Sequence, residues 1–312
     1  MSKAESLQAR PRIRKVDLSG NRIGNAGAEA CAELIRVSIW LQELRLSHCA
    51  LSCQVVPSLI SALRGSTCIK LIDLSGNIGI GSDGHMAIGA FLHFESSLEA
   101  LHMGFDDFDD GGFKALAEGL KVNRSLQELH LQSIGLNGAI SLVFDALREN
   151  SSLRLLNLSY CDIDEHVEAL SAVLRVNSGL EYLDLSNSDI GGRGAAFLGE
   201  ALHINTTLRT LDLASNDIGD EGALALGIAL GRNSSLTCIK LDCNSISDVG
   251  AVALGEALCA SPAMTVLDLG FNKIGSLGAE CIRRAQSENS RLDPVRLDGN
   301  PCKRYVNESC YL

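Results

Sequence analysis

Eleven copies of one short pattern fill most of this 312-residue chain. Each copy reads apolar, two variable residues, apolar, one variable residue, apolar, two variable residues and then usually Asn or Cys. The copies begin at Ile13, Leu41, Ile69, Leu98, Leu126, Leu153, Leu180, Leu208, Leu236, Met264 and Leu292, at intervals of 27 to 29 residues. Because such a unit buries its apolar side only against a neighbouring copy, the spacing predicts a stacked array of one unit. The expected boundaries are an N-terminal cap segment at 1–12, a repeat domain at 13–302 and a C-terminal cap or tail at 303–312.

The two halves of each copy predict different secondary structure. The first half, as in Leu211–Leu213, alternates apolar and polar residues, which is typical of a short strand. The second half, as in GAVALGEAL at 250–258, places leucines four residues apart on one face of a helix. Glycines on that face, such as Gly199 and Gly227, predict a close approach either between neighbouring helices or between helix and sheet. Asp220 and Asp248 are expected to cap helix starts. The prediction is an α/β solenoid of about eleven strand–helix repeats with parallel strands.

The ninth residue of a copy is expected to be structural. It is Asn in six copies: Asn21, Asn77, Asn216, Asn244, Asn272 and Asn300. A side-chain amide both donates and accepts, so it satisfies backbone groups freed where the chain turns inward after the strand. No catalytic role is assigned to these residues.

The Leu-x-x-Leu-x-Leu-x-x-Asn/Cys pattern resembles the leucine-rich repeat of the ribonuclease-inhibitor-like class. The same class occurs in the sensor ends of NOD-like receptors and in Ran GTPase-activating proteins. The resemblance implies a horseshoe with the parallel sheet on its concave face and the helices on its convex face. It specifies function weakly, because the class includes inhibitors, scaffolds, sensors and GTPase activators.

Composition and motifs exclude several functions. The net charge of -11 disfavours nucleic acid as a partner, because phosphate binding needs a basic surface. No stretch approaches the roughly 20 apolar residues of a membrane span, and the first residues lack the apolar run of a secretory signal. The expected location is therefore the cytoplasm, with the nucleus as the alternative. A monomer is expected.

Neither a cofactor nor a metal is expected from the motifs. The eleven cysteines lack the paired C-x-x-C spacing of zinc sites and are interpreted as reduced, packed thiols. The segment DFDDGGFKALAE, which begins at Asp107, matches a calcium loop in part, but Gly111 occupies the fifth position, which should supply a ligand. A phosphate-binding glycine loop is absent, and no nucleophile stands beside a base, so no catalytic residue is assigned.

Function is expected at the positions that point out of the sheet. In copies four to eight these positions hold aromatic, histidine and acidic residues. The predicted partner-binding residues are Phe105, His102, His130, Tyr160, Tyr182, Asp162, Asp184, Asp189, Asp212 and Asp217. Exposed aromatic side chains commonly dominate binding energy at protein interfaces. The sequence thus predicts a non-enzymatic scaffold or sensor that binds a protein partner, possibly through a basic segment of that partner.

Three other functions remain open. The chain resembles Ran GTPase-activating proteins in its eleven repeats, which makes a small GTPase a possible partner. However, Arg22 is the only arginine in its first two loops, and the catalytic role is not assigned to it. Inhibition of a basic ribonuclease is the second alternative. The third is a sensing region related to those of NOD-like receptors.

Overall fold

A computed structural model describes residues 12–64, 66–94 and 97–302 of the chain. The described residues divide into two compact units. The first unit contains residues up to Asp162 together with Val176–Asp184, and the second contains Ile163–Arg175 and the residues from Leu185 onward. Positions 1–11 of the predicted N-terminal cap and the whole predicted tail, 303–312, lie outside the described residues.

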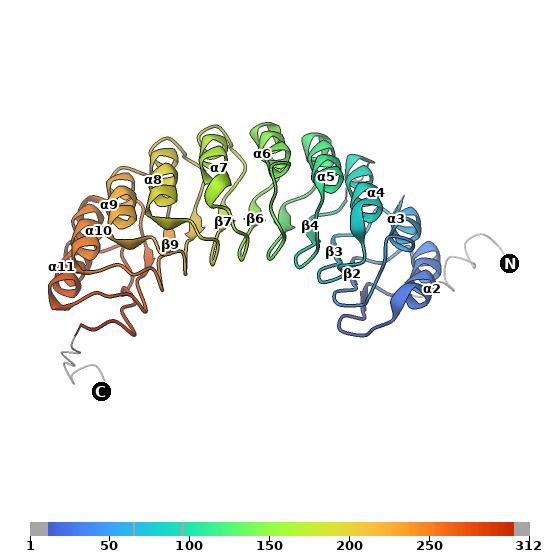
Figure 1. Ribbon diagram of the computed structural model, residues 1–312, viewed down its shortest axis with the longest axis horizontal. Helices are drawn as coiled ribbons and strands as arrows, with labels where there is room; N and C mark the ends of the chain where they lie inside the picture. The colour runs from blue at the N-terminus through green and yellow to red at the C-terminus, as the bar shows by residue number, and fades with distance from the viewer. Residues whose placement is uncertain (1–11, 65, 95–96, 303–312) are drawn as a thin grey trace. The chain divides into compact units, whose positions relative to one another are not determined.

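Short strands alternate with helices along both units. The strands are β1 (Lys15–Asp17), β2 (Glu43–Arg45), β3 (Leu71–Asp73), β4 (Ala100–His102), β5 (Glu128–His130), β6 (Leu155–Asn157), β7 (Tyr182–Asp184), β8 (Thr210–Asp212), β9 (Cys238–Lys240) and β10 (Val266–Asp268). The helices are α2 (Gly24–Val37), α3 (Val56–Leu63), α4 (Gly81–Phe94), α5 (Asp110–Val122), α6 (Ile140–Glu149), the 3-10 helix η1 (Asp164–His166), α7 (Val167–Leu174), α8 (Gly191–Leu202), α9 (Gly219–Leu230), α10 (Asp248–Ala260) and α11 (Ser276–Glu288). In each unit the helices form one layer and the strands another (Figure 1).

Equivalent residues of successive copies pair in register. In the first unit β1 to β7 pair in chain order, and all six pairings are parallel. In the second unit β8 pairs with β9 and β9 with β10, again parallel. The predicted leucine-rich repeat solenoid with parallel strands is confirmed.

The eleventh copy adds only an isolated bridge between Asp268 and Arg296. In the tenth copy the N–H groups of Thr265 and Val266 both donate to the Thr237 carbonyl. At the equivalent positions of the eleventh copy, Asp293 donates to Thr265, but Pro294 has no N–H. The strand is therefore interrupted, although the sequence pattern continues.

The leucines of the pattern form the core. Leu208, Leu211 and Leu213 are fully buried, and the helical leucines Leu198 and Leu202 are buried opposite them. The expected close approach of helices occurs at Gly199: a Cβ there would lie 3.0 Å from the Ala225 carbonyl oxygen on the next helix. Within the described residues, no helix combines the length and apolar character needed to cross a membrane.

The structural role predicted for the ninth residue is confirmed at Asn216. Its Oδ1 accepts hydrogen bonds from the N–H groups of Ser188 (2.9 Å) and Ile190 (3.2 Å). Its Nδ2 donates to the carbonyls of Leu185 (2.7 Å) and Ala214 (3.1 Å). One buried amide thus joins two consecutive repeats.

A second asparagine position follows the helices, and the sequence interpretation missed it. Asn233 is buried; its Nδ2 donates to the Leu202 carbonyl (2.6 Å), and its Oδ1 accepts from the N–H of Leu236 (2.7 Å). Asn123, Asn150, Asn177 and Asn205 repeat the arrangement. These residues satisfy backbone groups where each helix ends and the next strand begins.

The capping expectation needs a correction. Asp220 does not cap its own helix, α9, which has no side-chain hydrogen bond at its N-cap. It accepts instead from the N–H groups of Ser247 (2.8 Å) and Gly250 (2.9 Å) at the start of α10. Asp248 likewise accepts from the Gly278 N–H (2.6 Å) in α11. Each carboxylate therefore caps the helix of the following repeat.

Candidate protein-docking surface

The fifth residues of the copies form one row across the first unit. Strand register places Asp17, Arg45, Asp73, His102, His130, Asn157 and Asp184 in succession. Arg45 lies 3.9 Å from Asp73, and His102 Nδ1 lies 4.0 Å from the same carboxylate. The row therefore carries mixed charge at its start and imidazoles at its centre.

The two histidines contact each other. The ring centroids of His102 and His130 are 4.2 Å apart, with an interplanar angle of 53°. Burial, together with the neighbouring His130, lowers the pKa of His102 to about 4. Burial also lowers the pKa of His130. At neutral pH both rings are therefore uncharged and add no positive charge to this surface.

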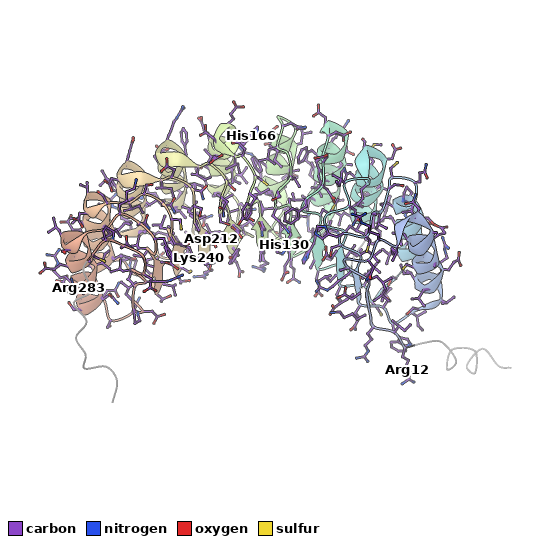
Figure 2. The ribbon with its side chains drawn as sticks, turned by 60° about the horizontal axis from the view of Figure 1, so that its bottom comes forward. Arg12, His130, His166, Asp212, Lys240 and Arg283 are labelled. Carbon is purple, nitrogen blue, oxygen red and sulfur yellow. The ribbon has the colours of Figure 1, made fainter. Side chains whose placement is uncertain are left out.

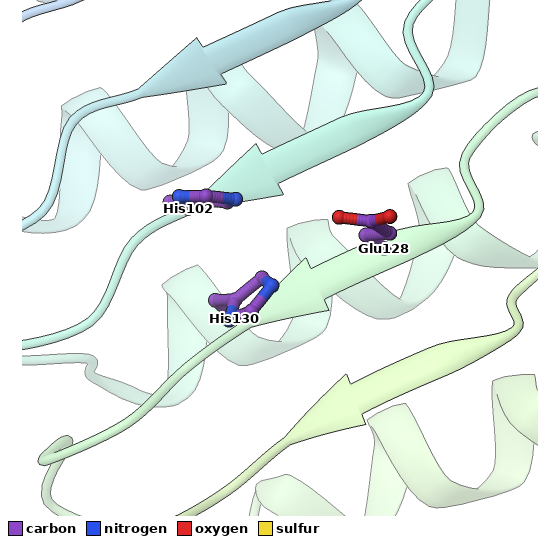
Figure 3. A group of neighbouring side chains, drawn as sticks. All are labelled: His102, Glu128 and His130. Carbon is purple, nitrogen blue, oxygen red and sulfur yellow. The ribbon is translucent and has the colours of Figure 1, made fainter. Parts of the chain in front are cut away.

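A carboxylate joins this pair. Glu128 stands two residues before His130 on β5, so both side chains leave the same face of the strand (Figure 3). One ligand atom from each of His102, Glu128 and His130 lies within 4.8 Å of the others. The sequence interpretation named both histidines but missed Glu128. The signal was present as a Glu-x-His strand with a second His exactly 28 residues earlier in the same repeat position.

Two predicted aromatic residues occupy the turn after a strand. Phe105 follows β4 and Tyr160 follows β6, each as the eighth residue of its copy. Phe105 is 47% exposed and Tyr160 61% exposed. Both have left-handed backbone conformation, with φ of 61° and 57°, where the first and third copies have glycine. A bulky residue is strained there by about 1–3 kcal/mol, so these rings are held outward at a cost to folding.

The remaining predicted residues are divided between the units. Tyr182 and Asp184 lie on β7, half-buried, and Asp162 is exposed after β6; all three belong to the first unit. Asp189, Asp212 and Asp217 belong to the second unit. Of the acidic residues predicted from the sequence, two thus belong to the first unit and three to the second.

Asp212 offers little to a partner. It is 6% exposed, and its Oδ2 lies 2.7 Å from Lys240 Nζ on the adjacent strand (Figure 2). Its Oδ1 accepts from the Ala214 N–H at 3.2 Å. The pair neutralises this carboxylate, whereas Asp189 and Asp217 are exposed in turns with φ of 52° and 49°.

The segment that resembles a calcium loop in part performs a structural task. Asp109 is the N-cap of α5, and its Oδ1 accepts from the Gly112 N–H at 2.8 Å. Asp106, at the ninth position of the fourth copy, is buried. These acidic residues therefore form the expected strand-to-helix turn of the repeat.

Comparison with known proteins agrees with this architecture. A family model described as Leucine Rich repeat matches residues 13–30, 149–165, 176–199, 205–227, 232–255 and 260–282. Ribonuclease inhibitor of Sus scrofa is 31% identical over 136 residues, which are 43% of this chain and 30% of that protein. NACHT, LRR and PYD domains-containing protein 12 of Homo sapiens is 30% identical over 130 residues, 41% of this chain and 12% of that protein. The chain thus matches less than a third of the length of either relative.

Two solved structures share the fold. A chain in the crystal structure of the Rad7 and Elc1 complex in yeast superimposes with a TM-score of 0.56 at 17% identity, covering 96% of this chain and 80% of that one. The leucine-rich repeat-containing protein LegL7 from Legionella pneumophila gives 0.55 at 15% identity, covering 92% and 89%. The chain is a leucine-rich repeat protein. It is distantly similar to ribonuclease inhibitor and to the human NACHT, LRR and PYD domains-containing protein 12.

Proposed function

We propose that this chain is a non-enzymatic protein-interaction module, a scaffold or a sensor, which binds a protein partner on the strand layer of its first unit. Leucine-rich repeat modules typically bind proteins. The proposed contact residues in that unit are His102, Phe105, His130, Tyr160, Asp162, Tyr182 and Asp184. Asp189 and Asp217 remain candidates for a separate contact on the second unit.

The observation that carries the proposal is the placement of Phe105 and Tyr160. Both rings are exposed, and both stand where glycine would relieve the backbone. A rigid aromatic side chain loses little conformational entropy on binding and buries a large area, which makes it a common anchor. The presence of two such rings, two repeats apart at strand ends, fits a surface that is used for contact.

Charge suggests the chemistry of the partner. The chain carries a net charge of -11, and Asp162 and Asp184 lie beside the aromatic residues in the repeat order. Since opposite charge steers association, a basic segment of the partner fits this surface. We place this interaction in the cytoplasm, with the nucleus as the alternative; the ten described cysteines are all free thiols, as in a reducing compartment.

The test is a comparison of matched variants in affinity capture. The chain with Phe105→Gly and Tyr160→Gly is compared with Phe271→Gly, which removes a 56% exposed aromatic from the same turn position in the second unit. The proposal expects proteins identified with the unchanged chain and with Phe271→Gly to be lost from the double variant. Equal capture by all three chains contradicts it.

Inhibition of a basic ribonuclease is the second candidate, and the similarity to ribonuclease inhibitor favours it. The matched segment covers only 30% of the pig protein, so the activity of that whole protein is a separate hypothesis here. Titration of a pancreatic-type ribonuclease with the purified chain tests it. Undiminished hydrolysis of RNA at excess chain excludes this candidate and leaves the first proposal intact.

A further inference from the structure

The centre of the first unit combines three metal-ligating side chains on two adjacent strands. Strand register sets His102 of β4 directly beside His130 of β5. The same register sets Ala100 beside Glu128, so only a methyl group stands opposite the carboxylate. Parallel strands are about 4.8 Å apart, and side chains at paired positions stand side by side on one face of the sheet. The backbone therefore brings two imidazoles and one carboxylate together.

The donor atoms of this group are available. His102 Nε2 is buried and has no hydrogen-bond partner in the described part of the chain. Among those same residues, no lysine, arginine or histidine forms an ion pair with Glu128. A buried ring nitrogen without a partner is costly, and a bound cation would remove that cost.

The dimensions suit a small divalent cation. The ligand atoms lie within 4.8 Å of one another. Bonds of about 2.1 Å to a tetrahedral zinc ion place ligand atoms roughly 3.4 Å apart, so the side chains would move inward by about an ångström. Rotation about their side-chain bonds provides that movement without displacing the strands. Imidazole and carboxylate are ligands that zinc accepts, and thiolate is not required.

We propose that His102, Glu128 and His130 bind a zinc ion, with the fourth coordination position open at the strand layer. Asp73 would be the outer partner: its carboxylate lies 4.0 Å from His102 Nδ1, which leaves Nε2, buried and without a partner among the described residues, for the metal. Such carboxylate–histidine pairs orient the ligand ring and raise its basicity. Asp73 is thus a positioning residue, and Arg45, 3.9 Å beyond it, is balanced by that same carboxylate.

This inference goes beyond the proposed protein docking and does not depend on it, because zinc binds the chain alone. The two are separable by experiment: loss of zinc binding leaves the aromatic anchors in place, and loss of a partner leaves the three ligands in place. The site also differs from the cysteine sites considered in the sequence, since none of its ligands is a thiol.

The experiment uses the full chain, reduced with a phosphine and freed of metal. Zinc affinity is measured by competition with a chromogenic chelator, and Co²⁺ serves as a spectroscopic probe of coordination. The variants are His130→Gln and Glu128→Gln. The control is His203→Gln, an exposed histidine at the end of α8 in the second unit. His130 is partly buried and Glu128 is exposed, so both variants are expected to fold. Circular dichroism of each metal-free chain verifies this.

The proposal expects one zinc ion per chain and a visible Co²⁺ spectrum without thiolate charge-transfer bands. It expects the zinc Kd to rise at least about tenfold in His130→Gln and in Glu128→Gln, since even outer-shell losses cost 10–100-fold. His203→Gln should bind as the unchanged chain does. Equal zinc affinity in all folded variants, thiolate bands in the Co²⁺ spectrum, or no binding by the unchanged chain would each overturn it.

Discussion

Asp106 occupies in the fourth copy the position that Asn77 occupies in the third, and it lacks half of the hydrogen-bonding capacity of that residue. Asn77 Oδ1 accepts from the N–H groups of Cys49 (3.0 Å) and Leu51 (3.1 Å), and its Nδ2 donates to the carbonyls of Leu46 and Leu74. A carboxyl group has at most one O–H to donate to such carbonyls, in place of the two N–H groups of the amide, and none when it is ionised. Both Asp106 oxygens are buried without a hydrogen-bond partner among the described residues. Burial raises the pKa of Asp106 to about 8, an effect that the nearby Asn77 backbone N–H offsets only in part.

Replacing Asp106 by asparagine should stabilise the protein at neutral pH. The folded pKa of about 8 lies above the unfolded value of 3.8, so the folded state binds more protons between these values. Stability from this group is complete below pH 3.8 and is lost as the pH rises through 8. Asp106→Asn removes this loss and restores an amide donor, a gain of about 1–3 kcal/mol at pH 7. Urea denaturation at pH 5, 7 and 8.5 measures it. The exposed neighbour Asp107, changed to Asn, is the control, and an equal gain there would contradict the assignment.

His85 should limit stability in acid. It is buried, its ring stacks on Phe108 with centroids 3.9 Å apart, and burial lowers its pKa to about 4. Because the folded pKa lies below the unfolded 6.5, stability is complete above pH 6.5 and is lost as the pH falls toward 4. His85→Leu should flatten the fall in unfolding free energy across that window. His93→Leu alters an exposed histidine of the same helix; a similar flattening there would show that the effect is not specific to burial.

Asn216→Ala should lower the free energy of unfolding by about 1–3 kcal/mol, the cost of leaving buried backbone groups unpaired. The amide serves two N–H groups and two carbonyls. The Ala214 carbonyl also accepts from the Asn187 N–H (2.8 Å), so the loss falls mainly on the other three groups. Asn216→Asp keeps the acceptor and loses the donor, which reproduces the situation at Asp106. Its destabilisation should therefore grow as the pH rises from acid to neutral. Denaturation midpoints of both variants, with exposed Ser178→Ala as the control, measure the difference. An unchanged midpoint in Asn216→Ala refutes the structural role.

Tyr160→Gly should weaken partner capture without lowering stability. Glycine relieves the strain of φ 57°, and this gain of about 1–3 kcal/mol offsets the roughly 1 kcal/mol that glycine loses in backbone entropy. Thermal denaturation is expected at the same temperature or higher. Phe271→Gly, with φ 53° in the second unit, should behave identically in stability. A marked drop in midpoint for Tyr160→Gly alone would mean that this ring stabilises the fold rather than a contact.

The repeat made the fold predictable from sequence, because each apolar position recurs in eleven copies and its burial follows from its place in the pattern. Leu211 and Asn216 behave as expected for that reason. The strand break at Pro294 and the interrepeat cap of Asp220 were not predicted, because both concern the relation of one copy to the next. The grouping of His102, Glu128 and His130 was missed for the same reason: strand register brings residues 28 positions apart together, and Glu128 was not considered beside the two histidines. Partner binding by Phe105, Tyr160 and Tyr182 depends on the surface of another protein, which the repeat pattern does not encode.

The carboxylates of Asp220 and Asp248 make the helix starts of the second unit depend on the preceding repeat and not on the following one. Each holds the beginning of the helix that follows, so α10 depends on the repeat before it and α11 depends on α10. Fraying that starts at α11 removes no carboxylate cap from the helices behind it. Opening at α9 removes the Asp220 contacts and leaves α10 with the cap of its own Ser247. Local melting in this unit is therefore expected to spread more readily from the N-terminal side than from the C-terminal side.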